Sequence, residues 1–115
     1  MRRGDIFLID FEPARGSEAN KARPAVIVSN DAANRSADRS GKGVVTVVPV
    51  TSNTSRVFPF QVVLLAGECG LAKDSKAQCE QVRAVSPDRV RQRLGAVPKP
   101  RMTELDAALR RHLAL

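Results

Sequence analysis

Several polar side chains stand where predicted strands begin or end, and their types are those that act on phosphate groups. Arg23 opens one predicted strand, and Thr51 and Ser52 directly follow another. An arginine binds phosphate oxygens through its planar fork of N–H groups, and a neighbouring hydroxyl can hold a third oxygen. Glu18 lies in a polar loop and Glu80 within a later predicted strand, where either carboxylate could accept a proton. Together these groups suit chemistry on a phosphodiester.

Each of these residues also has a structural interpretation, which the residues alone leave open. Arg23 could be an ordinary surface arginine, and Thr51 could belong to a polar turn, since such side chains bond their own backbone. Glu18 could be a solvent-facing loop residue, and Glu80 could be the ion-pair partner of Arg83.

The residue types that are missing narrow the mechanism. The only histidine is His112, so neither a histidine pair nor a Ser-His-Asp triad can be assembled with confidence. Cys69 and Cys79 form neither a zinc pattern nor a disulfide framework, and we expect two reduced thiols and neither metal nor cofactor. Charge must then be stabilised by arginine or lysine, and protons moved by carboxylates, hydroxyls or water. Cleavage of RNA is compatible with this set of side chains, because the RNA itself supplies the nucleophile, its 2′-hydroxyl.

Positive charge predominates in this chain of 115 residues, which holds 19 Lys and Arg against 12 Asp and Glu, a net charge of +7. It is concentrated in Asn34–Arg56 and Arg83–Arg101. Such a surface attracts polyphosphates or acidic proteins, although a basic domain without such partners is the alternative. There is no Trp or Tyr, and alternation places several of the four Phe in the core, so base stacking on an aromatic platform is not expected.

Short apolar segments separated by polar loops predict a mainly β chain. Strands are predicted at Asp5–Phe11, Arg23–Ser29, Val44–Val50, Phe58–Leu65 and Leu94–Val97, with a strand or bent strand pair at Lys76–Val85. Glu12–Ala22 and Asn30–Gly43 are polar and are predicted to be loops, and Ser86-Pro87 opens a segment with room for one helical turn.

The last segment is predicted to be an amphipathic helix. Pro100 can occupy its first turn, and one apolar face follows at Met102, Leu105, Leu109 and Leu113. We therefore expect a single domain, residues 1–115, built as a compact SH3-like antiparallel barrel of about five to seven strands with a C-terminal α-helix. No apolar run reaches the roughly 20 residues of a membrane span and no signal-peptide cleavage site is visible, so a cytoplasmic location is expected.

Five segments, taken in order, resemble the MazF/PemK-like toxins of bacterial type II toxin–antitoxin systems. They are RRGDIFLIDFEPARGSEAN, KARPAVIVSND, VVPVTSN, FPFQVVL and CEQVRAV, and the amphipathic helix follows them. Each motif is weak alone, but their order over essentially the whole chain is specific. The resemblance implies a homodimeric barrel that cleaves single-stranded RNA sequence-specifically and without metal, leaving a 2′,3′-cyclic phosphate and a 5′-hydroxyl.

The resemblance also implies roles for particular residues. Arg23 and Thr51 correspond to the catalytic pair of the family, and Glu18 to an acid that some members need. We expect Arg23 to stabilise the phosphorane, Thr51 to orient the phosphate or the 2′-hydroxyl, and Glu18, or failing it Glu80, to take the proton. Substrate contacts are expected from Gly16, Ser17, Asn20, Ser52, Asn53, Glu80 and Gln81.

Two departures from the PemK branch favour MazF-like chemistry. That branch has an arginine before the later acid and a histidine in the first loop, where this chain has Gln78 and Ser17. The expected partner is an acidic, partly disordered MazE-like antitoxin that covers the RNA groove of the dimer. A CcdB-like gyrase poison on the same fold and a non-catalytic nucleic-acid-binding module are the alternatives, and the joint presence of Arg23, Thr51 and Glu18 favours the ribonuclease over the gyrase poison.

Overall fold

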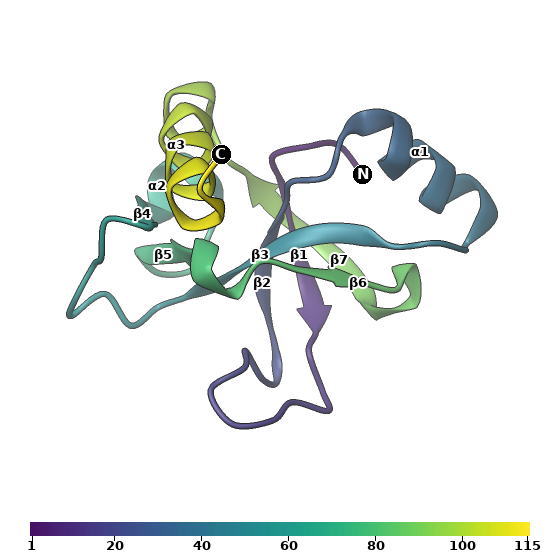
Figure 1. Ribbon diagram of the computed structural model, residues 1–115, viewed down its shortest axis with the longest axis horizontal. Coiled ribbons are helices and arrows are strands. Elements are labelled where there is room, and N and C mark those ends of the chain that lie inside the picture. Colours follow the sequence, from purple (N-terminus) through teal and green to yellow (C-terminus); the bar gives the residue numbers. More distant parts are fainter.

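A curved antiparallel sheet of seven strands forms the body of the computed structural model, which describes residues 1–115 (Figure 1). Its strands are β1 (Asp5–Asp10), β2 (Ala22–Ile27), β3 (Val45–Thr51), β4 (Gln61–Leu64), β5 (Ser75–Gln78), β6 (Arg83–Val85) and β7 (Val90–Ala96). They follow the order β4-β5-β3-β2-β1-β7, and β6 pairs with β3 beside this path. The mainly β, antiparallel prediction is confirmed, and the strand path is open, ending at β4 and β7.

Strand β3 joins two parts of the sheet and supplies both cores. Its first three residues pair with β6, its middle residues Val47–Pro49 pair with β2, and its last two residues pair with β5. Successive side chains of a strand point to opposite faces. Val45 and Val47 therefore pack with α1 and β1, whereas Val48 and Val50 pack with β4 and α3.

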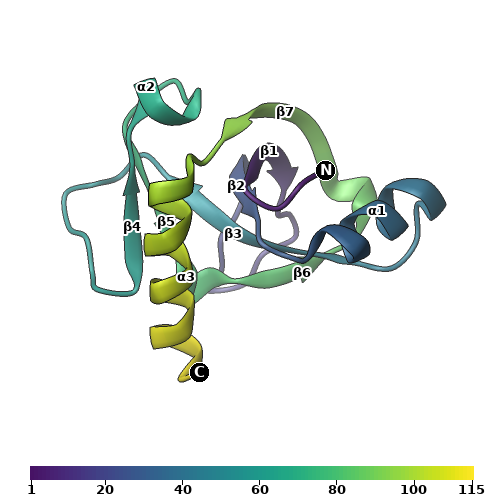
Figure 2. The ribbon, with the colours of Figure 1, turned by 90° about the horizontal axis from the view of Figure 1, so that it is seen from above.

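Three helices and two 3₁₀ turns complete the chain. They are α1 (Asp31–Ser40), α2 (Ala66–Cys69), η1 (Cys79–Gln81), η2 (Pro87–Arg89) and α3 (Lys99–Leu113). Figure 2 shows α3 beside β4 and β5, and α1 at the opposite end of the molecule near β6 and β7. The C-terminal helix is as predicted, with Leu105 fully buried, although Leu113 at its end is 49% exposed. None of the helices combines the length and the apolar character that crossing a membrane requires.

The prediction of a loop at Asn30–Gly43 is wrong over most of its length, because ten residues form α1. The Asn30 side chain caps the helix by accepting a hydrogen bond from the Ala33 N–H at 2.8 Å, and Gly41 ends it in the left-handed conformation. Only Asn34 and Ala37 are buried, and Asn34 bonds both the hydroxyl and the carbonyl of Ser29. An asparagine and an alanine do not make the apolar periodicity that indicates a helix.

Two strand boundaries also differ from the prediction. β4 begins only at Gln61, because the preceding residues turn: the Phe58 N–H donates to Gln61 Oε1, and the Gln61 N–H to the Phe58 carbonyl. β7 begins at Val90, earlier than predicted, because an edge strand that pairs only with β1 tolerates exposed arginines. The alternative of a bent strand pair at Lys76–Val85 is confirmed, since η1 separates β5 from β6.

The expectation that several phenylalanines lie in the core is wrong. Phe11 alone is fully buried, Phe7 and Phe60 are half-buried, and Phe58 is 38% exposed. The alternation of apolar and polar residues predicted a strand over Phe58 and Phe60, but both lie in the turn before β4. There their rings stack on each other with centroids 5.4 Å apart.

Both cysteines are free and buried, and this predicts that they are unreactive in the folded protein. Burial, with a smaller contribution from the Glu80 charge, raises the pKa of the Cys79 thiol to about 12, and burial also raises the pKa of Cys69. The thiolate is the reacting form. We expect iodoacetamide at about pH 8 to modify the urea-unfolded chain and leave the native one unmodified by mass spectrometry. Rapid labelling of native Cys79 would contradict this.

Candidate active site

Arg23 of β2 and Thr51 at the end of β3 lie just beyond the point where the pairing of these two strands ends. The two strands are antiparallel with Ala25 opposite Pro49. Arg23 and Thr51 each lie two residues beyond this last pair, Arg23 before Ala25 and Thr51 after Pro49. The two side chains that the sequence singled out for phosphate chemistry therefore lie at adjoining ends of two paired strands.

The guanidinium of Arg23 is half-buried and bound along one edge. Its Nε donates to the Asn20 carbonyl at 2.9 Å, and one terminal nitrogen donates to Asn20 Oδ1 at 2.7 Å. No carboxylate lies within ion-pair distance of it. Since the side chain has five N–H donors, its other donors and its full charge are free. An arginine held by neutral acceptors is prepared to bind an anion such as phosphate.

Thr51 closes β3 and begins a polar turn. Its hydroxyl oxygen accepts the Asn53 N–H at 3.2 Å, and Asn53 Oδ1 in turn accepts from the Ser55 hydroxyl at 2.8 Å. The structural interpretation of these residues as a turn is therefore correct. It is compatible with chemistry, because the hydroxyl proton of Thr51 is free to donate to a phosphate oxygen.

Lys76 is a neighbour of this pair that the sequence did not reveal. It lies opposite Thr51 across the β3–β5 pair, is only 7% exposed, and its ammonium donates to the Arg56 carbonyl. A buried ammonium adds positive potential beneath the turn. The only sequence indication is a lysine within the short strand Ser75–Gln78.

Glu18 stands apart from the Arg23–Thr51 pair. It is exposed in the β1–β2 loop, where its carboxylate accepts the Arg15 N–H at 2.6 Å and its own N–H donates to the Arg15 carbonyl at 3.0 Å. Gly16 and Ser17 form the rest of this exposed turn, and no hydrogen bond joins Glu18 to Arg23 or Thr51.

Gln81 anchors the β1–β2 loop. Its Nε2 donates to the Ser17 carbonyl at 2.8 Å, and its Oε1 accepts the Ala19 N–H at 3.0 Å. The prediction that Glu80 and Gln81 lie in mid-strand is wrong, because both belong to the 3₁₀ turn η1, which directs Gln81 to the loop.

Replacing Gln81 with alanine is therefore expected to free the loop. The loss of two hydrogen bonds, each contributing about 1 kcal/mol, should raise the rate of tryptic cleavage after exposed Arg15 by roughly tenfold or more. Gln92→Ala, on the exposed side of β7, is the matched control and should not alter this rate. Equal rates for both variants would show that the anchor does not hold the loop.

Glu80 points the other way, beneath the β3–β4 connection. Its Oε2 accepts from Gln61 Nε2 at 2.7 Å, and its Oε1 is buried without a hydrogen-bond partner. No ion pair joins it to Arg83, whose guanidinium instead lies 5.7 Å from the ring centroid of Phe11. Its carboxylate helps to position the connection that follows Thr51.

The fold and the site together define a small basic β protein with an arginine that has no carboxylate partner and a threonine hydroxyl at the ends of two neighbouring strands. The chain belongs to the family of PemK-like, MazF-like toxins of type II toxin–antitoxin systems, whose family model matches residues 2–113. The resemblance stated from the five motifs is therefore confirmed.

Relatives resemble the chain over nearly its whole length. It is 55% identical to the endoribonuclease MazF9 of Mycobacterium tuberculosis, covering 100% of this chain and 98% of the relative. It is 33% identical to the endoribonuclease MazF of Staphylococcus epidermidis, covering 95% of this chain and 88% of the relative.

Solved structures share the fold. The crystal structure of MazF from Deinococcus radiodurans superposes with a TM-score of 0.83 at 24% identity, covering 100% of this chain and 97% of that one. An endoribonuclease in complex with its cognate antitoxin, from a mycobacterial species, gives a TM-score of 0.75 at 25% identity, covering 100% of this chain and 96% of that one.

Proposed function

We propose that this MazF-like toxin is an endoribonuclease that cuts single-stranded RNA at the Arg23–Thr51 pair and is neutralised by an antitoxin. Full-length likeness to curated endoribonucleases supports the activity. The observation that carries the site is the guanidinium of Arg23, which is held by Asn20 alone and has no carboxylate to compensate its charge.

In the proposed reaction the 2′-oxygen attacks the adjacent phosphorus and the bond from phosphorus to the 5′-oxygen breaks. The products are a 2′,3′-cyclic phosphate and a 5′-hydroxyl, so one proton leaves the 2′-hydroxyl and another reaches the 5′-oxygen. Arg23 donates N–H groups to the non-bridging oxygens as charge grows on them, and the Thr51 hydroxyl donates to the same phosphate.

The proton acceptor is proposed to be Glu18; Glu80, the second candidate, would first have to leave its hydrogen bond with Gln61. Glu18 can act only if the loop tip turns, because its carboxylate is bound to the Arg15 N–H in the structure. The remaining proposed RNA contacts are Gly16, Ser17, Asn20, Ser52 and Asn53, all of which are exposed in the β1–β2 loop or after β3.

The same proposal includes a homodimer and an acidic antitoxin. A groove of about 420 Å³ between β4 and α3 is lined by Val57, Pro59, Val62, Val63 and Ala107, among others, and is the proposed contact with a second copy. The net charge of +7 favours fast, salt-sensitive association with an acidic peptide.

Incubation of the protein with a long single-stranded RNA in excess EDTA tests this proposal, with Arg23→Ala in parallel. We expect cleavage at a few discrete sites by the unmodified protein alone, with a cyclic phosphate on the 5′ fragment. Cleavage by both proteins would move the chemistry away from Arg23. RNA binding without cleavage by either protein would identify a non-catalytic module instead.

A further inference from the structure

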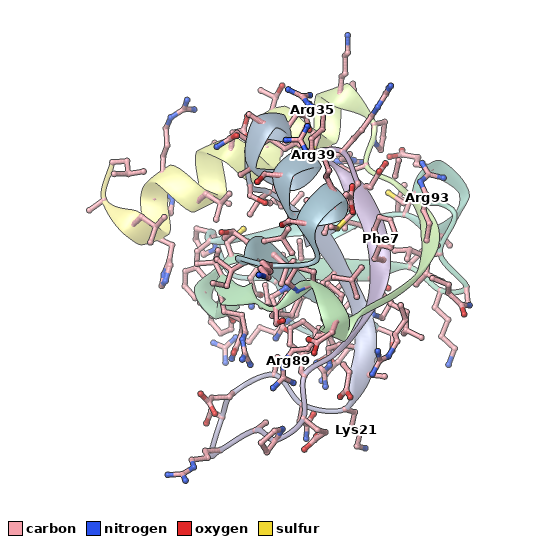
Figure 3. All side chains as sticks on the ribbon, turned by 90° about the vertical axis from the view of Figure 1, so that its right-hand side faces the viewer. Phe7, Lys21, Arg35, Arg39, Arg89 and Arg93 are labelled. Carbon is pink, nitrogen blue, oxygen red and sulfur yellow. The ribbon has the colours of Figure 1, made fainter.

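A second basic surface lies on the face formed by α1 and the edge strand β7 (Figure 3). Arg35 and Arg39 stand one helical turn apart on α1, both exposed, and neither makes a hydrogen bond or an ion pair through its side chain. Arg93 lies across from them on β7, and its side chain is 55% exposed. We call this region the α1–β7 surface.

Phe7 provides an apolar side chain next to Arg93 on this surface. It is half-buried and pairs with Arg93 across β1 and β7, so both side chains lie on one face of the sheet. A cavity of about 500 Å³ opens beside it, and its lining consists of Phe7 with Met1, Ala37, Asp38, Gly41, Pro87, Asp88, Val90 and Arg91, whereas Arg35, Arg39 and Arg93 lie outside it. An aromatic side chain in a cavity next to a basic surface has the form of a nucleotide site.

The charge on this surface is only partly compensated. Three carboxylates are already occupied, in the pairs Asp5–Arg93 at 3.3 Å, Asp10–Arg91 at 3.5 Å and Asp38 with the Met1 amino group. The carboxylate of Asp31, one helical turn before Arg35, interacts with the Arg35 charge without forming an ion pair, and Arg39 has no ion-pair partner, so both arginines can still bind a ligand. Asp88 lines the cavity, and its carboxylate makes no hydrogen bond or ion pair.

We propose that the α1–β7 surface binds single-stranded RNA outside the cleavage site, an inference that rests on the proposed function. Phosphates would lie at Arg35 and Arg39, and one base would pack against Phe7 with its N–H groups toward Asp88. An RNA base offers both a flat ring to Phe7 and N–H donors to Asp88, whereas the side chains of an acidic peptide segment offer neither. Figure 3 shows Arg89 and Lys21 between this surface and the β1–β2 loop, which leads to Arg23.

The binding test uses proteins that also carry Arg23→Ala, so that the RNA stays intact. The probe is a labelled RNA of about 25 nucleotides centred on a mapped cleavage site, compared with one of about 7 nucleotides that is too short to reach the surface. Arg35→Gln with Arg39→Gln should weaken binding of the long RNA about tenfold and reduce the slope of log K against log salt by about 1.4, or about 0.7 for each lost phosphate contact.

Lys99→Gln with Arg110→Gln removes the same charge from exposed positions of α3 and is the matched control. Equal weakening by both pairs would overturn the proposal, because net charge would explain it. Phe7→Leu, which keeps an apolar side chain but loses the flat ring, should weaken binding of the long RNA by several-fold, and unchanged thermal melting would show that the fold is intact.

Cleavage by the Arg23-containing proteins separates this inference from the proposed function. We expect the preference of the unmodified protein for the long RNA over the short one to fall about tenfold in the Arg35, Arg39 double variant. If the unmodified protein cut neither RNA, the proposed function would fail while the binding series still decided the inference. If the double variant bound the long RNA normally but bound a glutamate-rich peptide less tightly, the surface would be a peptide site.

Discussion

Replacing Arg23 with alanine is expected to lower kcat/KM for RNA cleavage by about 10²- to 10³-fold, or about 3–4 kcal/mol, which is the loss that follows removal of one preorganised donor. The reason is specific to this position. The guanidinium is half-buried, is bound only to Asn20 and has no carboxylate partner, so nothing else nearby replaces its charge on the phosphorane. Single-turnover cleavage of an end-labelled RNA measures the effect.

Two further substitutions separate catalysis from loop support. Arg23→Lys keeps the charge but not the planar fork, so its activity should fall between the unmodified protein and Arg23→Ala. Asn20→Ala removes the side-chain acceptor of Arg23 but keeps the backbone carbonyl that accepts from Nε, so the guanidinium stays bound at one point. Asn20→Ala should therefore lose less activity than Arg23→Ala, and an equal loss would show that the Asn20 side chain matters as much to cleavage as the arginine. Lys99→Ala, on α3, should retain full activity.

Gly95→Ala is expected to have the largest effect on stability. A Cβ at Gly95 would lie 1.9 Å from the Cys69 carbonyl oxygen and 3.2 Å from the Gly70 Cα, both of them backbone atoms that no side-chain rotation can move. α2 therefore rests directly on β7 at this glycine. Relief requires the helix to move off the strand, so we expect a loss of about 3 kcal/mol or more and a fall in Tm of at least about 10 °C.

Gly67→Ala is the matched control for this prediction. Gly67 lies in α2 itself, yet a Cβ there would meet nothing within 4 Å. Alanine favours a helix over glycine by up to about 1 kcal/mol, so the control should keep or slightly raise Tm. Urea unfolding measures the free energy of unfolding of both variants. Similar unfolding midpoints for Gly95→Ala and Gly67→Ala would show that the contact of α2 with β7 is not tight.

The elements that bury a regular apolar pattern were predictable, and those that do not were missed. β1, the valines of β3 and the terminal helix with Leu105 all carry side chains at the spacing that burial requires. α1 buries only Asn34 and Ala37 and depends on its Asn30 cap, so its pattern is too weak to see. β4 is shortened by a hydrogen-bonded turn that Gln61 makes through its side chain, which no periodicity reports.

In the candidate site, too, some features could be predicted from the sequence and others could not. The positions of Arg23 and Thr51 at strand ends were predictable, but their proximity depends on the β2–β3 register, which one sequence does not specify. Gln81 serves the loop through hydrogen bonds to backbone atoms, which can belong to any residue and so leave no mark in the sequence. The catalytic roles of Arg23, Thr51 and Glu18 stay predictions.

The backbone anchor at Gln81 has a consequence for how such a protein can evolve. Its two bonds reach the Ser17 carbonyl and the Ala19 N–H, so substitution of the Ser17 side chain leaves both bonds in place. Under the proposed function, mutations at this position can therefore change what the loop presents to RNA without loosening it. A duplicated copy can acquire a new target in single steps, each of which leaves a folded protein with its Arg23 and Thr51 unchanged.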